Sequence, residues 1–273
     1  MAEIRAFRPT DMDELYAICL ATGAGGSDAF EFSRDPKLLG HIYAAPYALL
    51  SPRTVFVVED AAGIGGYIVG VPDTRDFEAR LEAEWWPALR KMYPDPSGTP
   101  RTDRSADQVM SYKIHHPDRT ADEIVGRYPS HLHINLLPRL RGQGVGRRLM
   151  VQWLATVRDM GSQGAHLAVG PANRRAIRFY RACGFDELER PSRPQSAAVW
   201  FAIDLRGATD ASCTAGAAGV MLRSAEIGRR VQPCQTASKR IRPSVGSPPG
   251  SVVHGRQPDA QAEHPDDRRG LRL

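Results

Sequence analysis

The sequence predicts a mixed α/β or α+β fold, and three features support this prediction. Two strand-like segments, 54–59 and 66–71, are joined by a short turn, which is typical of an antiparallel hairpin. Residues 131–183 then alternate strand, helix, strand and helix. The helix expected at 145–160 has strong helical periodicity. An antiparallel start followed by this alternation indicates a mixed sheet with helices packed on it.

The first half of the chain supplies the hairpin and several helices. A strand is expected at 3–7, and Pro9 is followed by a helix with Thr10 or Asp11 as its cap. Residues 35–50 are apolar and aromatic and predict a helix that ends near Ala45 and Pro46. Apolar residues recur with helical spacing over 77–92, where Pro87 is expected to bend the helix. Segment 93–120 is polar and rich in proline, and it is interpreted as an insertion or lid.

The second half predicts a regular alternation. A strand at 131–137 precedes the helix at 145–160, and a strand at 166–169 precedes a helix at 173–183. Gly184 is expected to stop that helix. Phe185 and residues 199–205 begin and end a last pair of strands. No internal repeat is visible.

The chain of 273 residues divides sharply in composition near Arg206. Residues 1–206 contain all of the aromatic residues and predict a folded domain. Residues 207–273 have no Phe, Tyr or Trp and are rich in Pro, Gly and Arg. Such a segment buries too little apolar surface to offset the entropy of ordering, so a disordered tail is expected there.

Charge and composition restrict the class of protein. The net charge is +5, and most of the excess is in residues 207–273, so the folded part is almost neutral. A neutral domain argues against a nucleic-acid partner. No apolar run is long enough for a transmembrane helix, and residues 1–5 do not start a secretory signal. The four cysteines form no Cys-x-x-Cys motif, and a cytoplasmic location is expected.

A glycine-rich turn carries the strongest chemical signal. Arg141, Gly142, Gln143, Gly144, Val145 and Gly146 stand between an expected strand and an expected helix. Glycines at such a turn allow backbone N–H groups to surround an anion, and the helix N-terminus adds partial positive charge. Arg141, Arg147 and Arg148 add full positive charges. The spacing fits neither a Walker loop nor a dinucleotide fingerprint, and a basic turn without a ligand is the plainer alternative.

Together with a second motif, this turn resembles the acyl-CoA motif of the GNAT N-acetyltransferases. The second motif is the run Asn-x-x-Ala-x-x-Phe-Tyr from Asn173 to Tyr180, followed by Gly184 and Phe185. The resemblance covers about residues 3–205. The segments 35–47 (DPKLLGHIYAAPY) and 128–138 (YPSHLHINLLP) are also similar to the acetyltransferase-like domain of O-GlcNAc hydrolases.

The resemblance implies a mostly antiparallel sheet flanked by helices, in which the fourth and fifth strands splay. Acetyl-CoA is then the expected co-substrate, its pantetheine arm paired with backbone groups of residues 135–137, among them Leu136 and Leu137. The amides of residues 142–146 hold the pyrophosphate, and Asn173 bonds the arm or the phosphate end. The resemblance also implies direct attack of an amine on the thioester, with a strand N–H at the developing oxyanion.

Candidate catalytic residues follow from these roles. Tyr180 is the candidate general acid for the leaving thiolate, and its alternative is a core aromatic. His131, His133 and Asn135 share one strand face by alternation, and His133 is a candidate base, unless it is a hydrogen-bonded strand histidine. Asn135 cannot act as a base and at most orients the substrate. Glu84 is another candidate base, or a solvated helix carboxylate.

Several alternatives stay open from the sequence. Tyr43, Tyr47, Trp85, Trp86 and Tyr93 fit either an acceptor pocket or core packing. The adjacent histidines His115 and His116 lack the spacing of a zinc site, and no metal is expected. The preferred function is acetyl transfer to an unidentified amine, and the alternative is a non-catalytic acetyl-CoA-binding or protein-interaction module. A monomer or a homodimer without a membrane partner is expected.

Overall fold

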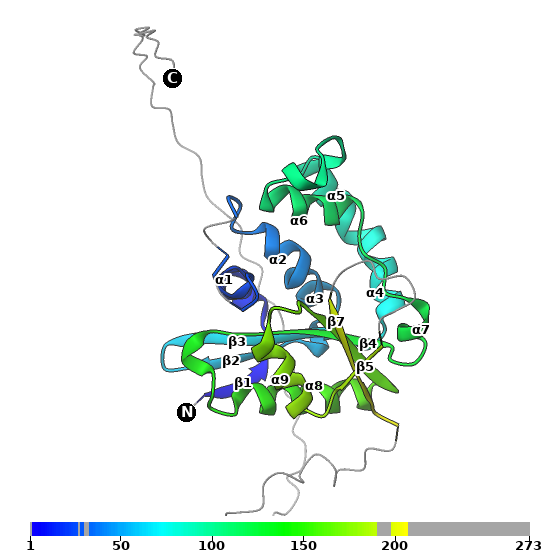
Figure 1. Cartoon of the computed structure of the whole chain (residues 1–273). Helices are drawn as coiled ribbons and strands as arrows, with labels where there is room; N and C mark the ends of the chain where they lie inside the picture. Colours follow the sequence, from blue (N-terminus) through cyan, green and yellow to red (C-terminus); the bar gives the residue numbers. More distant parts are fainter. Residues whose placement is uncertain (1, 27, 30–32, 190–197, 207–273) are drawn as a thin grey trace, which may run out of the picture. The chain divides into compact units, whose positions relative to one another are not determined.

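The fold is built on one seven-stranded sheet (Figure 1). The computed structural model describes residues 2–26, 28–29, 33–189 and 198–206. The strand order is β1-β2-β3-β4-β5-β7-β6, and β4 and β5 are the parallel neighbours in an otherwise antiparallel sheet. The strands are β1 (Glu3–Ala6), β2 (Phe56–Asp60), β3 (Gly63–Val71), β4 (Ser130–Leu136), β5 (Gly164–Val169), β6 (Asp186–Glu187) and β7 (Val199–Asp204). The predicted mixed, mostly antiparallel fold is confirmed.

Helices cover both faces of this sheet. In Figure 1, α1 to α6 lie above the sheet, and α8 and α9 lie below it. The helices are α1 (Met12–Thr22), α2 (Leu38–Tyr43), α3 (Ala45–Leu50), α4 (Thr74–Arg80), α5 (Trp86–Met92), α6 (Ala106–His115), α7 (Asp122–Val125), α8 (Val145–Asp159) and α9 (Arg174–Ala182). The expected tail, residues 207–273, lies outside the described residues.

Each face of the sheet has its own hydrophobic core. Below the sheet, the apolar stripe of α8 packs on β2 to β5, and Trp153 is fully buried there. The indole Nε1 of Trp153 donates to the carbonyl oxygen of Thr54 at 3.1 Å, which satisfies its polar atom. Above the sheet, Leu15 and Tyr67 are at the centre of a second cluster formed by α1 to α3 and β3. The alternation of β4 therefore separates a core-facing row from a row that faces α1 to α4.

The fork between β4 and β5 positions the site. The described pairing of these strands covers Ser130 with Ala165 and His131 with His166, and β4 continues to Leu136 while β5 continues to Val169. On its other side, β4 pairs with β3 along 131–136. The expected splay of the fourth and fifth strands is therefore present, and one edge of β4 is open beyond His131.

The sequence-based element boundaries need correction above the sheet. The helix expected to end near Ala45 and Pro46 is α2, which ends at Tyr43. The chain turns at Ala44, which has φ −138°, and a second helix, α3, follows with Pro46 in its first turn. The helix expected at 77–92 is interrupted by a π-helical turn, Leu81–Trp85, which ends two residues before Pro87.

The segment 93–120, interpreted from the sequence as an insertion or lid, contains regular secondary structure. It contains α6, which begins with a capping box in which Gln108 N donates to Ser105 Oγ at 3.2 Å and Ser105 N donates to Gln108 Oε1 at 2.9 Å. Ile114 of this helix is fully buried against Trp86 and Leu89. The segment is therefore packed on the domain through a small hydrophobic cluster.

Candidate functional site

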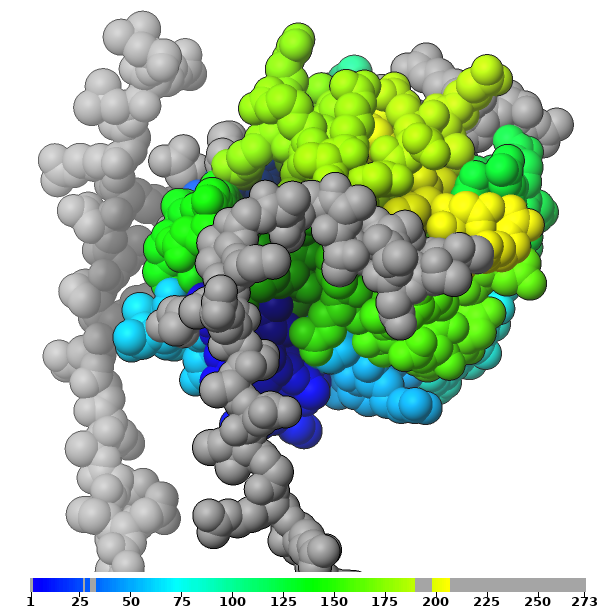
Figure 2. All heavy atoms as spheres, turned by 90° about the horizontal axis from the view of Figure 1, so that it is seen from below, coloured from blue at the N-terminus to red at the C-terminus, as the bar shows by residue number. Residues whose placement is uncertain are grey.

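The glycine-rich turn forms a cradle of free backbone amides. Gly142 and Gly144 have φ values of +76° and +72°, and a Cβ at either position would meet no atom within 4 Å. Within the described part of the chain, the N–H groups of residues 142–147 have no hydrogen-bond acceptor. They lie at the N-terminus of α8, which adds the positive end of the helix dipole. Figure 2 shows the face of the molecule on which α8 and α9 lie. These features fit the pyrophosphate of a nucleotide cofactor.

The arginine of this turn holds neighbouring backbone. Arg141 Nε donates to the carbonyl oxygen of Leu136 at 2.8 Å, and its Nη2 donates to that of Gly26 at 2.8 Å. Arg175 Nη2 also donates to the Gly26 carbonyl, at 3.3 Å. Gln143 Nε2 donates to the Arg139 carbonyl oxygen at 2.7 Å. The side chains of Arg141 and Gln143 therefore fix the shape of the turn, and its backbone amides have no acceptor among the described residues.

The open edge of β4 offers backbone groups to an extended ligand. The bond from Arg141 places the Leu136 carbonyl on this edge, and alternation places the backbone groups of Ile134 on the same edge. Leu137 N already donates to the Gly65 carbonyl oxygen at 2.8 Å. Of the expected segment 135–137, the N–H of Leu136 is therefore available for strand-like pairing, and Leu137 is not.

The helix α9 carries two of the predicted site residues. Asn173 is its N-cap, and Asn173 Oδ1 accepts from Ala176 N at 3.1 Å. Tyr180 is 8% exposed, with its ring against Phe185 and Phe201. Its hydroxyl has no hydrogen-bond partner among the described residues and is not one of the fully buried unpaired side-chain atoms there. Burial raises the pKa of Tyr180, which keeps its proton at neutral pH.

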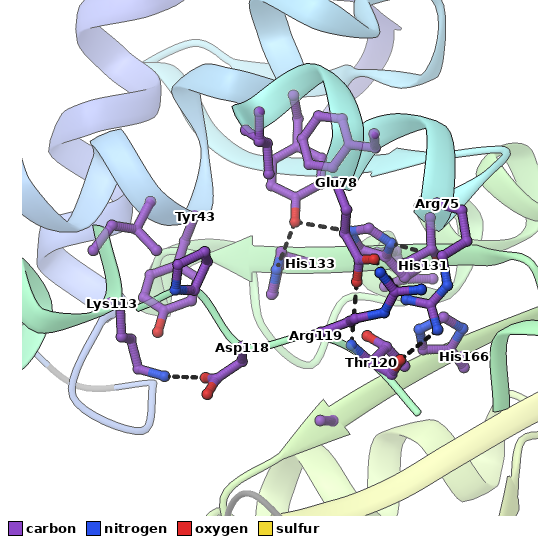
Figure 3. A pocket seen from close by; sticks show the side chains of 18 of the residues that line it. Tyr43, Arg75, Glu78, Lys113, Asp118, Arg119, Thr120, His131, His133 and His166 are labelled. Atoms are coloured by element: carbon purple, nitrogen blue, oxygen red, sulfur yellow. Dashed lines mark hydrogen bonds and ion pairs between the residues drawn. The ribbon is translucent and has the colours of Figure 1, made fainter. Parts of the chain in front are cut away.

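A cavity of about 470 Å³ lies above the fork of β4 and β5 (Figure 3). Its walls come from α2, α3, α4, α6 and the segment 117–120. Its aromatic lining consists of Tyr43, Tyr47, Phe77, Trp86, Trp200, His131, His133 and His166. Of the five aromatic residues that fitted either a pocket or the core, Tyr43, Tyr47 and Trp86 line this cavity. The volume and the apolar lining suit a small organic molecule.

Histidines of β4 and β5 form the floor of this cavity. Tyr47 Oη lies 2.9 Å from His131 Nε2 and 3.2 Å from His133 Nε2. His131 Nδ1 lies 2.8 Å from Thr74 Oγ1. Burial, with smaller contributions from neighbouring imidazoles, lowers the pKa of His131 well below its usual range and that of His133 to about 4. Both rings are therefore neutral at pH 7.

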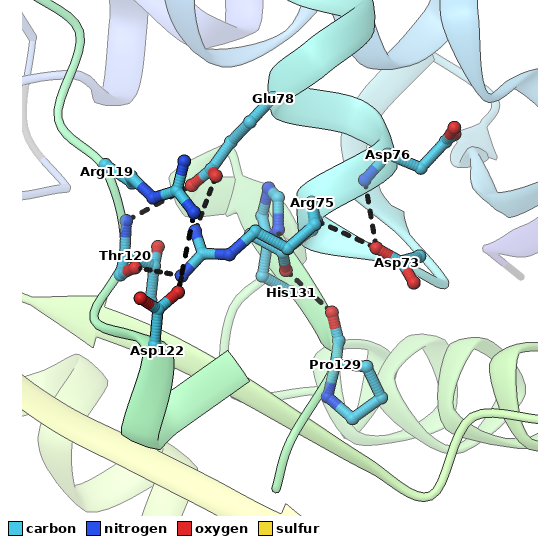
Figure 4. Close-up of polar contacts among 10 residues, drawn as sticks. Asp73, Arg75, Asp76, Glu78, Arg119, Thr120, Asp122, Pro129 and His131 are labelled. Atoms are coloured by element: carbon cyan, nitrogen blue, oxygen red, sulfur yellow. Dashed lines mark hydrogen bonds and ion pairs between the residues drawn. The ribbon is translucent and has the colours of Figure 1, made fainter. Parts of the chain in front are cut away.

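The charged side chains around the cavity are paired with one another (Figure 4). Arg75 donates to the Glu78 carboxylate at 2.5 Å and to the Thr120 carbonyl oxygen at 2.6 Å. It also pairs with Asp122, and this contact lowers the pKa of Asp122. Thr120 N donates to Glu78 Oε1 at 3.1 Å. Lys113 pairs with Asp118. These contacts tie the wall 117–120 to α4.

Other candidates from the sequence lie away from the cavity. Asn135 Nδ2 donates to Thr22 Oγ1 at 2.6 Å and ties β4 to α1. Glu84 pairs with Arg80 at 2.9 Å on an exposed turn. Among the described residues, no group of three His, Cys, Asp or Glu side chains could hold a metal ion. None of the helices that the structure describes is long and apolar enough to cross a bilayer.

Sequence reasoning missed Thr74, Arg75 and Glu78. Thr74 begins α4, where Asp73 is the N-cap and accepts from Arg75 N at 2.8 Å and from Asp76 N at 3.0 Å. The Asp-x-x-Asp pattern of a helix start is visible in the sequence. No sequence pattern, however, shows that this helix start lies against β4.

Comparison with known proteins bears on the family of the chain. A model of the Acetyltransferase (GNAT) family matches residues 72–185, which include the histidine floor, the glycine turn and α9. The solved structure of SsHAT has 35% sequence identity and a TM-score of 0.68, and the match covers 74% of this chain and 98% of SsHAT.

Two curated mammalian proteins are also similar. Protein O-GlcNAcase of Mus musculus is 27% identical over 188 residues, and that of Rattus norvegicus is 26% identical over the same length. Each match covers 68% of this chain and 20% of the mammalian protein. The chain therefore spans about a fifth of the length of these relatives.

Proposed function

Because the chain belongs to the GNAT family of acetyltransferases, we propose that it transfers an acetyl group from acetyl-CoA to an amine. The observation that carries this proposal is the cradle of free amides at residues 142–147 beside the open edge of β4. The cradle suits a pyrophosphate, and the edge suits an extended arm that ends at the fork. The cavity above the fork is the proposed acceptor site.

The residues around the fork can divide the proton transfers of such a reaction. The amine nitrogen forms a bond to the thioester carbon, and the carbon–sulfur bond breaks. The nitrogen loses one proton, and the leaving sulfur gains one. His133 takes the proton that the amine nitrogen loses, directly or through a water molecule. Tyr180 gives its proton to the leaving sulfur, and both groups are restored from solvent. Asn135 supports β4 from α1, and its role is structural.

Calorimetric titration of acetyl-CoA into the full chain tests the first step. We expect saturable one-site binding that is tighter than that of adenosine alone, because adenosine lacks the pyrophosphate and the arm. Folded protein that does not bind acetyl-CoA would refute the assignment of the cradle.

Release of free CoA thiol in the presence of amines tests the second step. Thiol release that depends on both the amine and the protein would support the transferase. Binding of acetyl-CoA without thiol release across small amines, sugar amines and peptides would favour the alternative, a non-catalytic module that binds acetyl-CoA.

A further inference from the structure

We propose that Thr74, His131 and Tyr47 form a directional hydrogen-bond chain that holds His133 in one neutral tautomer, with Nδ1 free to accept the substrate proton. The assignment of Nδ1 as the base rests on the proposed function. The chain itself depends only on the contacts among these four side chains. Tyr47 is a positioning residue in this arrangement, because it acts on the substrate through His133.

The direction of the chain is fixed at its far end. Thr74 N and Thr74 Oγ1 both donate to the carbonyl oxygen of Pro129, at 2.9 and 2.6 Å. A carbonyl oxygen can only accept, and a hydroxyl has a single proton. The proton of Thr74 is therefore committed to Pro129, and Thr74 Oγ1 must accept from His131 Nδ1 at 2.8 Å. His131 Nδ1 carries the proton as a result.

The same reasoning passes along the chain to Tyr47. A neutral imidazole has one N–H, so His131 Nε2 is unprotonated and accepts from the Tyr47 hydroxyl at 2.9 Å. Burial raises the pKa of Tyr47, which retains its proton for this bond. With its proton directed at His131, Tyr47 Oη accepts from His133 Nε2 at 3.2 Å. His133 is therefore protonated at Nε2.

The remaining nitrogen of His133 is the reactive one. In the part of the chain that the structure describes, Nδ1 of His133 has no hydrogen-bond partner. This atom is also not fully buried. Since His133 lines the cavity, this lone pair is accessible to a molecule within it. The Nε2–H bond to Tyr47 stabilises the ring when Nδ1 gains a proton.

The weak basicity of His133 is compatible with this role. The amine nitrogen becomes strongly acidic once it bonds to the thioester carbon, because it then carries a positive charge. The proton moves from that nitrogen to His133 Nδ1, and the imidazolium then returns it to water in the cavity. No oxidant or further reactant is required.

Nuclear magnetic resonance of ¹⁵N-histidine-labelled full chain tests the tautomer directly. Long-range ¹H–¹⁵N correlations distinguish the two neutral forms of an imidazole, and His133→Gln identifies the signals of His133. We expect one Nε2–H form in the unaltered protein and a mixture of forms in Tyr47→Phe. Tyr47→Phe keeps the ring that stacks on Phe77 at 4.5 Å, so the fold is expected to survive.

Tyr43→Phe is the matched control for this spectrum. It removes a hydroxyl oxygen, as Tyr47→Phe does. The centroid of the Tyr43 ring lies 5.5 Å from that of His133, but Tyr43 takes no part in the hydrogen-bond chain, so the His133 tautomer should not change. An Nδ1–H form of His133 in the unaltered protein, or an unchanged spectrum in Tyr47→Phe, would overturn the hydrogen-bond chain.

Steady-state thiol release tests the base. We expect His133→Gln to lower kcat by about 10²- to 10⁴-fold with the KM for acetyl-CoA unchanged, and Tyr47→Phe to lower kcat less. Unaltered kcat in His133→Gln would overturn the base assignment. Unaltered protein that releases no thiol with any amine, yet has the expected tautomer, would refute the proposed function and leave the hydrogen-bond chain intact.

Discussion

Acidification should destabilise this fold through His166, which lies at the start of the fork. Its side chain is 2% exposed, and its Nδ1 lies 2.6 Å from the Tyr128 carbonyl oxygen. Because a carbonyl only accepts, Nδ1 carries a proton and the neutral ring has none on Nε2. Burial lowers the pKa of His166 from an ordinary value of about 6.5 to about 4. The hydrogen bond that His166 Nδ1 donates to the Tyr128 carbonyl oxygen opposes this shift without cancelling it.

The direction and size of this loss of stability follow from the difference between the pKa of His166 in the folded chain and in the unfolded chain. Below pH 6.5 the unfolded chain binds a proton at His166 that the folded chain does not, so the free energy of unfolding decreases as the pH is lowered. The stability is fully present above pH 6.5 and is lost as the pH falls toward 4. At pH 5 the loss from His166 is about 2 kcal/mol, and the complete shift corresponds to about 3.4 kcal/mol. His131 and His133 have lowered pKa values and act in the same direction.

Urea unfolding of the full chain at pH 7.5 and pH 5 measures this loss. His166→Gln keeps an N–H that can reach the Tyr128 carbonyl but does not titrate, so its stability should depend less on pH, by about 2 kcal/mol over this interval. Comparing each protein with itself at pH 7.5 separates this effect from any general cost of the substitution. An equal pH dependence in both proteins would refute the reasoning.

Three substitutions test other parts of the structure. Gly144→Glu should abolish acetyl-CoA binding in calorimetry, because it places a carboxylate and strained backbone in the cradle; Gly98→Glu, which makes the same charge change where a Cβ meets no atom within 4 Å, should bind normally. Tyr180→Phe should lower kcat by about 10²- to 10⁴-fold with normal acetyl-CoA affinity, and turnover equal to the unaltered protein would remove Tyr180 from the mechanism. Gly70→Ala should lower the free energy of unfolding by about 1–3 kcal/mol, because its Cβ would lie 2.4 Å from the His131 carbonyl oxygen; a neutral effect in urea unfolding would contradict this close packing.

Much of the fold could be predicted because local pattern and tertiary structure agree below the sheet. The stripe of α8 has helical spacing, and its buried residues are the ones that the spacing indicates. Above the sheet the agreement is weaker. The capping box at Ser105 and Gln108 is a clear helix start, but it is surrounded by proline-rich sequence, and the buried contact of Ile114 with Trp86 is not local.

The candidate site was predictable where its signal is contiguous. The glycine turn and the alternation of His131 and His133 follow from neighbouring residues. The hydrogen-bond chain does not, because Tyr47, Thr74 and His131 come from α3, α4 and β4 and meet only when the helices pack on the sheet. The commitment of the Thr74 proton depends on Pro129, which no pattern around Thr74 reveals.

The strand β4 supplies a different group in each of three directions, and this is the reason for placing the proposed site at the fork. Leu132 is buried in the core with α8, while His133 faces the cavity. The edge of the strand beyond His131 is left open by β5, so its backbone can pair with an extended arm. Pairing with β3 along 131–136 fixes the register, and a slip of one residue would exchange the buried and cavity-facing rows. The position of His133 Nδ1 relative to the open edge of β4 is therefore set by β3, whose central residues Tyr67, Ile68 and Val69 are completely buried.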